Sequence, residues 1–330
     1  MRRSLRFGAL AAGLVLAPLS APALDILLSN DDGQAAAGIQ ALRAALCDAG
    51  HHVTLVGPTT DQSGRGGSIN TGALSSSSAM ALTRVSSDAC GVQYALAAPT
   101  TPGRYGGTPL DSIRAGLTVV LAGDPPDLVV TGLNQGQNLG QPTSNTSGTV
   151  GAALGGVFAG IPAIAGSVGV IFAESSTGFP TTQAAFPLAA DFMARLIDKL
   201  EAAPGADLLP KGIGMLNVNF PVPYEATQDV VLTRLGAEAE LDLPLFDRNV
   251  GFPPLLPGNP ALPSCATLAD GQACSVGVGV VFLEGPDPLS HADTDAFRAG
   301  KIGITPMDGD MTAQGLGILS LAFRIHGLTP

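Results

Sequence analysis

A short apolar run that ends in two adjacent carboxylates constrains the fold of this chain more than any other feature. Residues 26–29 read Ile-Leu-Leu-Ser, and Asn30, Asp31, Asp32 and Gly33 follow them directly. An apolar run of this length is typical of a buried strand, and open α/β sheets carry their sites at the carboxyl ends of such strands. Two neighbouring carboxylates repel each other, so a fold that keeps both ionised usually supplies a cation. An Asx turn that caps a helix is the simpler interpretation of the same residues.

Strand-like and helix-like segments alternate along residues 24–225. Residues 38–46 have apolar side chains at helical spacing, and Gly50 is a natural stop for that helix. Asp111 is placed to cap a second helix through Leu121, and residues 182–201 form an amphipathic pattern. Further strands are expected at residues 52–58, 127–132, 163–167 and 213–220. The alternation predicts an α/β fold with a doubly wound, mostly parallel sheet between two helical layers, as in Rossmann-like proteins.

Two parts of the chain depart from this alternation. Residues 71–98 are rich in Ser and Ala, which predicts a β-hairpin or an excursion away from the sheet, and a polar loop is expected after Gly132. Beyond Pro221 the chain becomes Pro-rich, with one strand expected at 276–283, a helix at 293–300 and a short edge-like segment at 302–306. We therefore expect a catalytic core at residues 24–225 and a C-terminal arm at 226–330. Such extensions often cover a site or form subunit contacts.

The first 23 residues have the pattern of a secretory signal peptide. Arg2, Arg3 and Arg6 precede an apolar stretch at residues 7–19, and residues 21–23 read Ala-Pro-Ala. The apolar stretch is too short for a membrane span, so no membrane anchor is expected. The sequence predicts a secreted or periplasmic protein that is cleaved after Ala23.

The charge balance limits the partners of the chain. The formal net charge is −11, and the loss of three arginines with the signal peptide lowers it to −14. Such an acidic surface argues against a nucleic-acid polymer or an anionic membrane as partner. An anionic substrate would need a local positive site, from a metal ion or a helix N-terminus.

Four cysteines form an even set in a chain with an export signal. Three pairings are possible, and nearness in sequence favours Cys265–Cys274, which leaves Cys47–Cys90. The spacings fit no zinc-site pattern, so we expect disulfides.

Three further polar segments resemble the first in their position after a strand or at a helix start. They are residues 61–64 (Asp-Gln-Ser-Gly), 132–138 (Gly-Leu-Asn-Gln-Gly-Gln-Asn) and 147–150 (Ser-Gly-Thr-Val). Loops that follow parallel strands converge at one edge of the sheet. Oxygen donors alone suit Mg²⁺ or Mn²⁺, with Ca²⁺ as a further option. A Ser-Gly-Thr sequence at a helix N-terminus offers free N–H groups and hydroxyls to a phosphate.

These motifs, together with residues 216–221 and 304–306, resemble in order and spacing the SurE family of metal-dependent 5′(3′)-nucleotidases and acid phosphatases. The resemblance spans residues 26–306 and implies a dimer or tetramer with exchanged arms. It implies that Asp31, Asp32, Ser63 and Asn134 bind a divalent metal ion, and that Asp31 or Asp32 orients or deprotonates the attacking water. Asn138, Ser147, Gly148 and Thr149 would hold the phosphate. Thr146 departs from the family, in which Tyr commonly stands before Ser-Gly-Thr.

The sequence therefore predicts an enzyme that hydrolyses nucleoside 5′- or 3′-monophosphates, with a small-molecule phosphomonoester as its partner. His291 is a candidate acid for the leaving group. A broad-specificity exported acid phosphatase is the alternative enzyme. A Ser-His-Asp hydrolase is disfavoured because residues 165–169 lack the first glycine of a Gly-x-Ser-x-Gly elbow. From another class, a periplasmic protein could bind phosphate-bearing ligands without turnover, although such a protein has no need for paired carboxylates.

Overall fold

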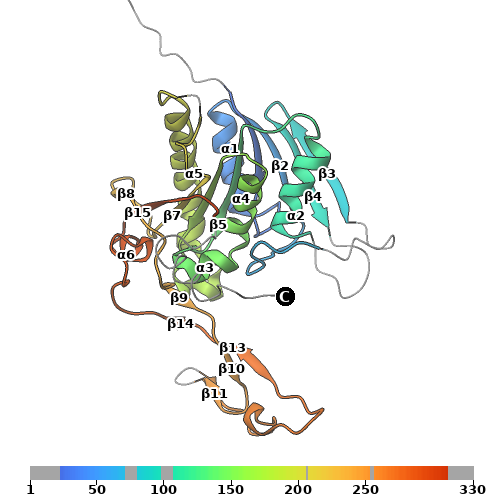
Figure 1. The fold of residues 1–330 in the computed structure, drawn as a ribbon, viewed down its shortest axis with the longest axis vertical. Coiled ribbons are helices and arrows are strands. Elements are labelled where there is room, and N and C mark those ends of the chain that lie inside the picture. Colours follow the sequence, from blue (N-terminus) through green and yellow to red (C-terminus); the bar gives the residue numbers. More distant parts are fainter. Residues whose placement is uncertain (1–22, 71–79, 98–106, 206, 253–255, 311–330) are drawn as a thin grey trace, which may run out of the picture.

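The fold is a nine-stranded mixed sheet with helices on both faces (Figure 1). A computed structural model describes residues 23–70, 80–97, 107–205, 207–252 and 256–310. The expected signal peptide lies outside these residues, apart from Ala23. The strand order in the sheet is β3-β4-β2-β1-β5-β6-β7-β15-β8.

Six neighbouring strands of this sheet run parallel. They are β4 (Gly91–Ala97), β2 (His52–Pro58), β1 (Asp25–Ser29), β5 (Leu128–Gln135), β6 (Ala163–Val168) and β7 (Met215–Phe220). β3 (Ala81–Asp88) pairs antiparallel with β4, and β15 (Ile302–Met307) pairs antiparallel with β7. β8 (Val230–Leu232) completes the edge beside β15. The doubly wound, mostly parallel sheet is confirmed.

Alternate residues of each buried strand pack into two separate hydrophobic cores, because successive side chains of a strand point to opposite faces of the sheet. Ile26 and Leu28 of β1 pack under α1 (Ala37–Asp48) and α5 (Pro180–Glu201). Leu27 faces the other layer, which contains α2 (Pro109–Ala115) and α4 (Gly148–Phe158). A π-helical turn (Gly116–Val120) extends α2. The strands at the centre of the sheet are thus covered on both sides, and their polar ends are brought to one edge.

The Ser- and Ala-rich region includes the β3–β4 hairpin, the first of its two expected forms, which extends the sheet through the pairing of β4 with β2 and does not leave it. The sequence misplaced two other features of the core. Thr108, not Asp111, is the N-cap of α2. The Asp111 side chain, at the third helical position, accepts from the Thr108 N–H, and the Thr108 hydroxyl accepts from the Asp111 N–H, which together form a capping box. Part of the expected polar loop is a helix, α3 (Gly140–Thr146).

The segment expected to form an arm is divided between the sheet and a projection from it. β8, β15 and α6 (Asp293–Arg298) pack with the core, so residues 302–306 lie inside the sheet between β7 and β8 and are not an edge. The expected single strand at 276–283 is two short strands, β13 (Val276–Val278) and β14 (Val281–Phe282), with different partners. The projection (Figure 1) also contains β9 (Leu241–Asp242), β10 (Leu245–Asp247), β11 (Gly251–Phe252) and β12 (Leu256–Pro257). Two 3₁₀ turns complete the described elements, at Phe172–Thr177 and Cys265–Thr267.

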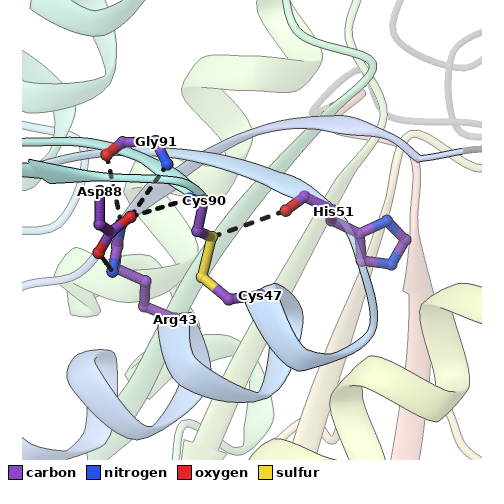
Figure 2. Close-up of a disulfide and its surroundings, with 6 residues drawn as sticks. All are labelled: Arg43, Cys47, His51, Asp88, Cys90 and Gly91. Atoms are coloured by element: carbon purple, nitrogen blue, oxygen red, sulfur yellow. Dashed lines mark hydrogen bonds and ion pairs between the residues drawn. A yellow bond between two sulfur atoms is a disulfide. The ribbon is translucent and has the colours of Figure 1, made fainter.

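Both expected disulfides are present. Cys265–Cys274 closes a loop of the projecting segment. Cys47–Cys90 joins the end of α1 to the turn between β3 and β4, where Arg43 also forms a two-bond ion pair with Asp88 (Figure 2). The Cys90 Sγ lies 3.6 Å from the His51 carbonyl oxygen. This is a contact and not a hydrogen bond, because an oxidised sulfur carries no proton. Among the described residues, no helix is long and apolar enough to cross a membrane.

Candidate active site at the carboxyl edge of the sheet

Asp31 lies where the end of β1 meets the N-terminus of α4. The Thr149 hydroxyl donates a 2.6 Å hydrogen bond to Asp31 Oδ1, and both side chains are buried. The Thr149 carbonyl in turn accepts a 2.9 Å bond from the Thr131 hydroxyl of β5. The first turn of α4 is thereby fixed against two strands of the sheet, with its N-terminus directed at a carboxylate. A helix N-terminus attracts negative charge.

Burial dominates the ionisation of Asp31. It raises the pKa of this carboxyl, and the hydrogen bond from Thr149 opposes the rise without cancelling it. The negative charge of Asp61 raises the pKa further.

Asp32 is held by the main chain of the next strand. The Gln135 N–H donates a 2.9 Å hydrogen bond to Asp32 Oδ2. Burial first, and then the charge of Asp31, raise the pKa of Asp32 to about 7. Asp32 lines a cavity of about 290 Å³ whose other lining residues include Asp61, Gln135, Gln183 and Phe186. Asp32 therefore borders a space large enough for an ion and its ligands.

Asp61 lines this cavity, although no role was expected for it from the sequence. Its charge acts on both Asp31 and Asp32. Asp61 Oδ1 accepts hydrogen bonds from the Ser63 main-chain N–H at 2.8 Å and from the Ser63 hydroxyl at 2.7 Å. The sequence signal that could have identified Asp61 is its position two residues before Ser63, an expected metal ligand. Ser63 itself is exposed, and its loop is tied to the site by the Gln62 N–H, which donates to the Asp31 carbonyl at 2.8 Å.

The two asparagines expected in the site, Asn134 for the metal ion and Asn138 for the phosphate, belong to the end of β5 and the loop that follows it. Asn134 is at the end of β5, where its Nδ2 donates to the Gly136 carbonyl at 2.6 Å. Asn138 is buried further along the same edge, and its Nδ2 donates to Ser167 Oγ at 2.9 Å. The Asn138 main chain is fixed by Asn217 and Asn219 of β7. These two asparagines are part of the network that positions Asn138, which the sequence motif alone did not show.

The expected phosphate loop forms the start of α4. Ser147 is the N-cap, and its hydroxyl accepts a 3.1 Å bond from the Val150 N–H. Gly148 packs directly against the Asp31 side chain. Asp31, Gly148 and Thr149 are therefore in contact, whereas no hydrogen bond among the described residues joins Ser63 or Asn138 to a carboxylate of the pair. His291 is exposed at the start of α6, and its role as leaving-group acid stays a prediction.

The donor set fits a divalent cation. The adjacent carboxylates of Asp31 and Asp32 and a third nearby, that of Asp61, repel one another, and the hydrogen bonds to the pair do not cancel the rise in their pKa values. Carboxylates that repel one another in a site shielded from water are stabilised by a divalent cation, which prefers oxygen ligands. No cluster of three or more His, Cys, Asp or Glu ligands occurs among the described residues. Hydroxyl, amide or water oxygens would therefore complete the coordination.

The fold and this edge define a three-layer α/β protein with an oxygen-donor site at a helix N-terminus. The family model described as "Survival protein SurE" matches residues 26–241, and the chain belongs to the SurE family. It is 33% identical to a protein named 5′-nucleotidase SurE from Thermosynechococcus vestitus, over 92% of this chain and 98% of that one. A protein of the same name from Xanthomonas axonopodis is 34% identical over 92% and 96%. The crystal structure of SurE from Aquifex aeolicus matches with a TM-score of 0.62 and 26% identity, covering 91% of this chain and 98% of that chain.

Proposed function

We propose that this chain is a metal-dependent phosphomonoesterase that converts nucleoside 5′- or 3′-monophosphates to nucleoside and phosphate. The curated relatives are named 5′-nucleotidases and match this chain over almost its whole length. The observation that carries the proposal is the pair formed by the buried Asp31 and the partly buried Asp32 beside the N-terminus of α4. Carboxylates that hold a cation next to a helix N-terminus form a site for a phosphate dianion.

Asp31, Asp32, Ser63 and Asn134 are the residues proposed to hold the metal ion, which we expect to be Mg²⁺ or Mn²⁺, with Ca²⁺ as a further option. Asp61 is proposed to act with them, because it borders the same cavity as Asp32. When bound, the ion would neutralise phosphoryl charge and lower the pKa of water.

The protein's own groups have separable tasks in the reaction. The main-chain N–H groups of Gly148 and Thr149 begin α4 and are proposed to bind the non-bridging oxygens of the phosphate, together with Ser147 and Asn138. The Thr149 hydroxyl keeps Asp31 oriented. Asp32 is fixed by Gln135 and is the group proposed to orient the attacking water and accept its proton.

Phosphate release from a panel of substrates tests this proposal. The panel contains nucleoside 5′-monophosphates, nucleoside 3′-monophosphates and an aryl phosphate, each with Mg²⁺ or Mn²⁺. We expect faster release from nucleotides than from the aryl ester. Equal rates across the panel favour the acid phosphatase. Stoichiometric binding of nucleotide without any release, by a folded and metal-loaded protein, contradicts the enzyme and favours the binding protein.

The proposed assembly is a dimer or tetramer built with the projecting segment. Exposed apolar side chains of that segment, including Leu243, Leu245 and Val278, are suited to a subunit contact. Light scattering that finds a monomer at micromolar concentration contradicts this assembly.

A further inference from the structure

The opposite edge of the sheet, where β1 begins, anchors the chain from Leu24 onward. The Leu24 N–H donates a 3.2 Å hydrogen bond to His51 Nδ1, and the Leu24 carbonyl accepts a 2.9 Å bond from the His52 N–H. The Leu24 side chain packs against the core under α1 and α5. Ala23 is exposed, and in the described part of the chain no hydrogen bond reaches it. Among the described residues, the main-chain hydrogen bonds at this end of the chain therefore begin at Leu24 and not at Ala23.

A carboxylate without a partner lies beside this boundary. Leu24, Asp127 and Glu201 line one cavity of about 550 Å³, together with apolar residues such as Ile161 and Leu209. Both carboxylate oxygens of Glu201 are shielded from solvent and accept no hydrogen bond from the described residues. A shielded carboxylate without donors is costly. This burial raises the pKa of Glu201.

The charges around Glu201 have both signs, since His51 favours the ionised carboxylate while two neighbouring carboxylates oppose it, and none of these groups donates a hydrogen bond to Glu201. Asp198, one turn earlier on α5, and Asp127 both act on Glu201 with repulsive charge. Asp127 Oδ2 is already engaged by the Asp25 N–H at 2.8 Å. His51 is buried with its Nε2 3.3 Å from Asp198 Oδ1. Because His51 Nδ1 accepts from Leu24, the ring proton of the neutral form is on Nε2, facing Asp198. In this tautomer His51 accepts from Leu24 and donates no hydrogen bond to Glu201, although a charge on the ring favours the ionised form of Glu201.

We propose that proteolysis between Ala23 and Leu24 makes Leu24 the first residue, and that its new α-ammonium group is bound by His51 Nδ1 and the Glu201 carboxylate. Hydrolysis of this peptide bond adds one water molecule: the carboxylate leaves on Ala23, and the amine stays on Leu24 and takes up a proton. The amide of the uncleaved chain has one N–H, which His51 uses. The ammonium has three, so it can keep that bond and also supply donors and a positive charge to Glu201.

Two independent observations meet at this bond. The sequence places the Ala-Pro-Ala cleavage pattern immediately before Leu24. In the structure, Leu24 carries the first main-chain nitrogen that is anchored by a hydrogen bond, and it lines the same cavity as Glu201, whose carboxylate lacks a donor. The inference concerns the amino edge of the sheet and does not depend on the activity proposed for the opposite edge. Figure 2 shows His51 close to the Cys47–Cys90 disulfide, which holds the loop that presents its ring.

The first test compares two oxidised chains made from a cleavable fusion, one beginning at Leu24 and one that retains Ala23. We expect N-terminal sequencing of the exported protein to read Leu-Asp-Ile. We expect the chain that begins at Leu24 to have a Tm higher by about 2–4 °C, because the longer chain moves its ammonium out of the cluster. In Glu201→Gln the two chains should melt at the same temperature. The matched control Asp191→Asn, an exposed carboxylate of the same helix, should keep the difference.

A second measurement covers the case in which Glu201→Gln does not fold. An amine-selective acylating reagent at pH 7 should label the α-amine of the chain that begins at Leu24 at least about tenfold more slowly than that of the chain that retains Ala23, because the bound ammonium must first dissociate and lose a proton. An exported N-terminus at another residue overturns the proposal. Equal Tm values together with equal labelling rates for the two wild-type chains also overturn it.

Discussion

Gly148 and Asp31 are packed so closely that residue 148 has no room for a side chain. A Cβ placed on Gly148 would lie 2.7 Å from the Asp31 Cβ and 2.8 Å from Asp31 Oδ2. Both distances are well inside van der Waals contact. The start of α4 therefore approaches the carboxylate by main chain alone, as a site that binds ions through N–H groups requires.

Gly148→Ala is expected to displace the Asp31 carboxylate and lower phosphate release by at least about 100-fold, because sub-ångström misplacement of a metal ligand costs this much. Helix propensity would by itself favour Ala at this position. The matched control is Gly67→Ala, since a Cβ on Gly67 meets no atom within 4 Å. Steady-state rates with saturating metal measure both variants, and equal rates would contradict the packing argument.

Thr149→Val is expected to remove the side-chain hydrogen bond that Asp31 accepts within the described part of the chain, while keeping the shape of a fully buried residue. A hydrogen bond to a charged group is worth about 2 kcal/mol, so we expect the free energy of unfolding and the metal affinity to fall together. Thr149→Ser keeps the hydroxyl and should keep most of the affinity. Urea unfolding and metal titration measure the two effects. A Val variant with unchanged metal affinity would show that the Thr149 hydroxyl does not support metal binding by Asp31.

Metal binding is expected to weaken as pH falls below about 7. The pKa of Asp32 is raised to about 7 in the metal-free chain, chiefly by burial. Below this pH a proton must leave before the carboxylate can bind an ion, so the apparent affinity should fall by up to about tenfold per pH unit. The sign for folding is opposite: the metal-free chain should lose stability as pH rises from about 4 through 7, because the folded state binds this proton more tightly than the unfolded chain.

Calorimetric titration of Mn²⁺ in two buffers of different ionisation enthalpy measures both the affinity and the proton released. We expect close to one proton at pH 6 and fewer at pH 8. Affinity that does not change between pH 5 and 7 would contradict the raised pKa of Asp32.

Local patterns predicted the elements that carry the site. The apolar run before Asp31 is β1, the helical spacing after Gly38 is α1, and Ser147 caps α4 as its residue type predicts. Each of these depends on neighbours within a few residues in sequence. The four polar segments also converge at one sheet edge, as expected for loops that follow parallel strands.

Features that depend on distant contacts were not predicted. α3 contains Gly, Pro, Thr, Ser and Asn, which are poor helix formers, and its place is fixed by tertiary contacts such as the Gln141 N–H bond to the Gly236 carbonyl. The position of β15 inside the sheet follows from pairing with β7. The contribution of Asp61 is a charge effect across the cavity, which no local spacing shows.

The Cys47–Cys90 disulfide is expected to contribute more to stability than Cys265–Cys274. The two bonds span sequence separations of 43 and 9 residues. The chain-entropy relation gives about 4 kcal/mol for the longer loop and about 2.6 kcal/mol for the shorter one. Urea unfolding of the two double Cys→Ala variants measures the difference. Equal losses, or a larger loss from the Cys265–Cys274 variant, would contradict this ranking.

The central claim is that Asp31 and Asp32 hold a divalent ion that supports hydrolysis of a nucleotide phosphate. The most direct measurement is phosphate release from a nucleoside 5′-monophosphate by wild type and Asp32→Asn, first stripped of metal by a chelator and then given Mn²⁺ or Mg²⁺. We expect release by the wild type to stop on stripping and return with the ion, and release by the folded variant to stay at least about 100-fold lower with either metal. Release that persists in the stripped wild type, or a variant as active as the wild type, would contradict the account.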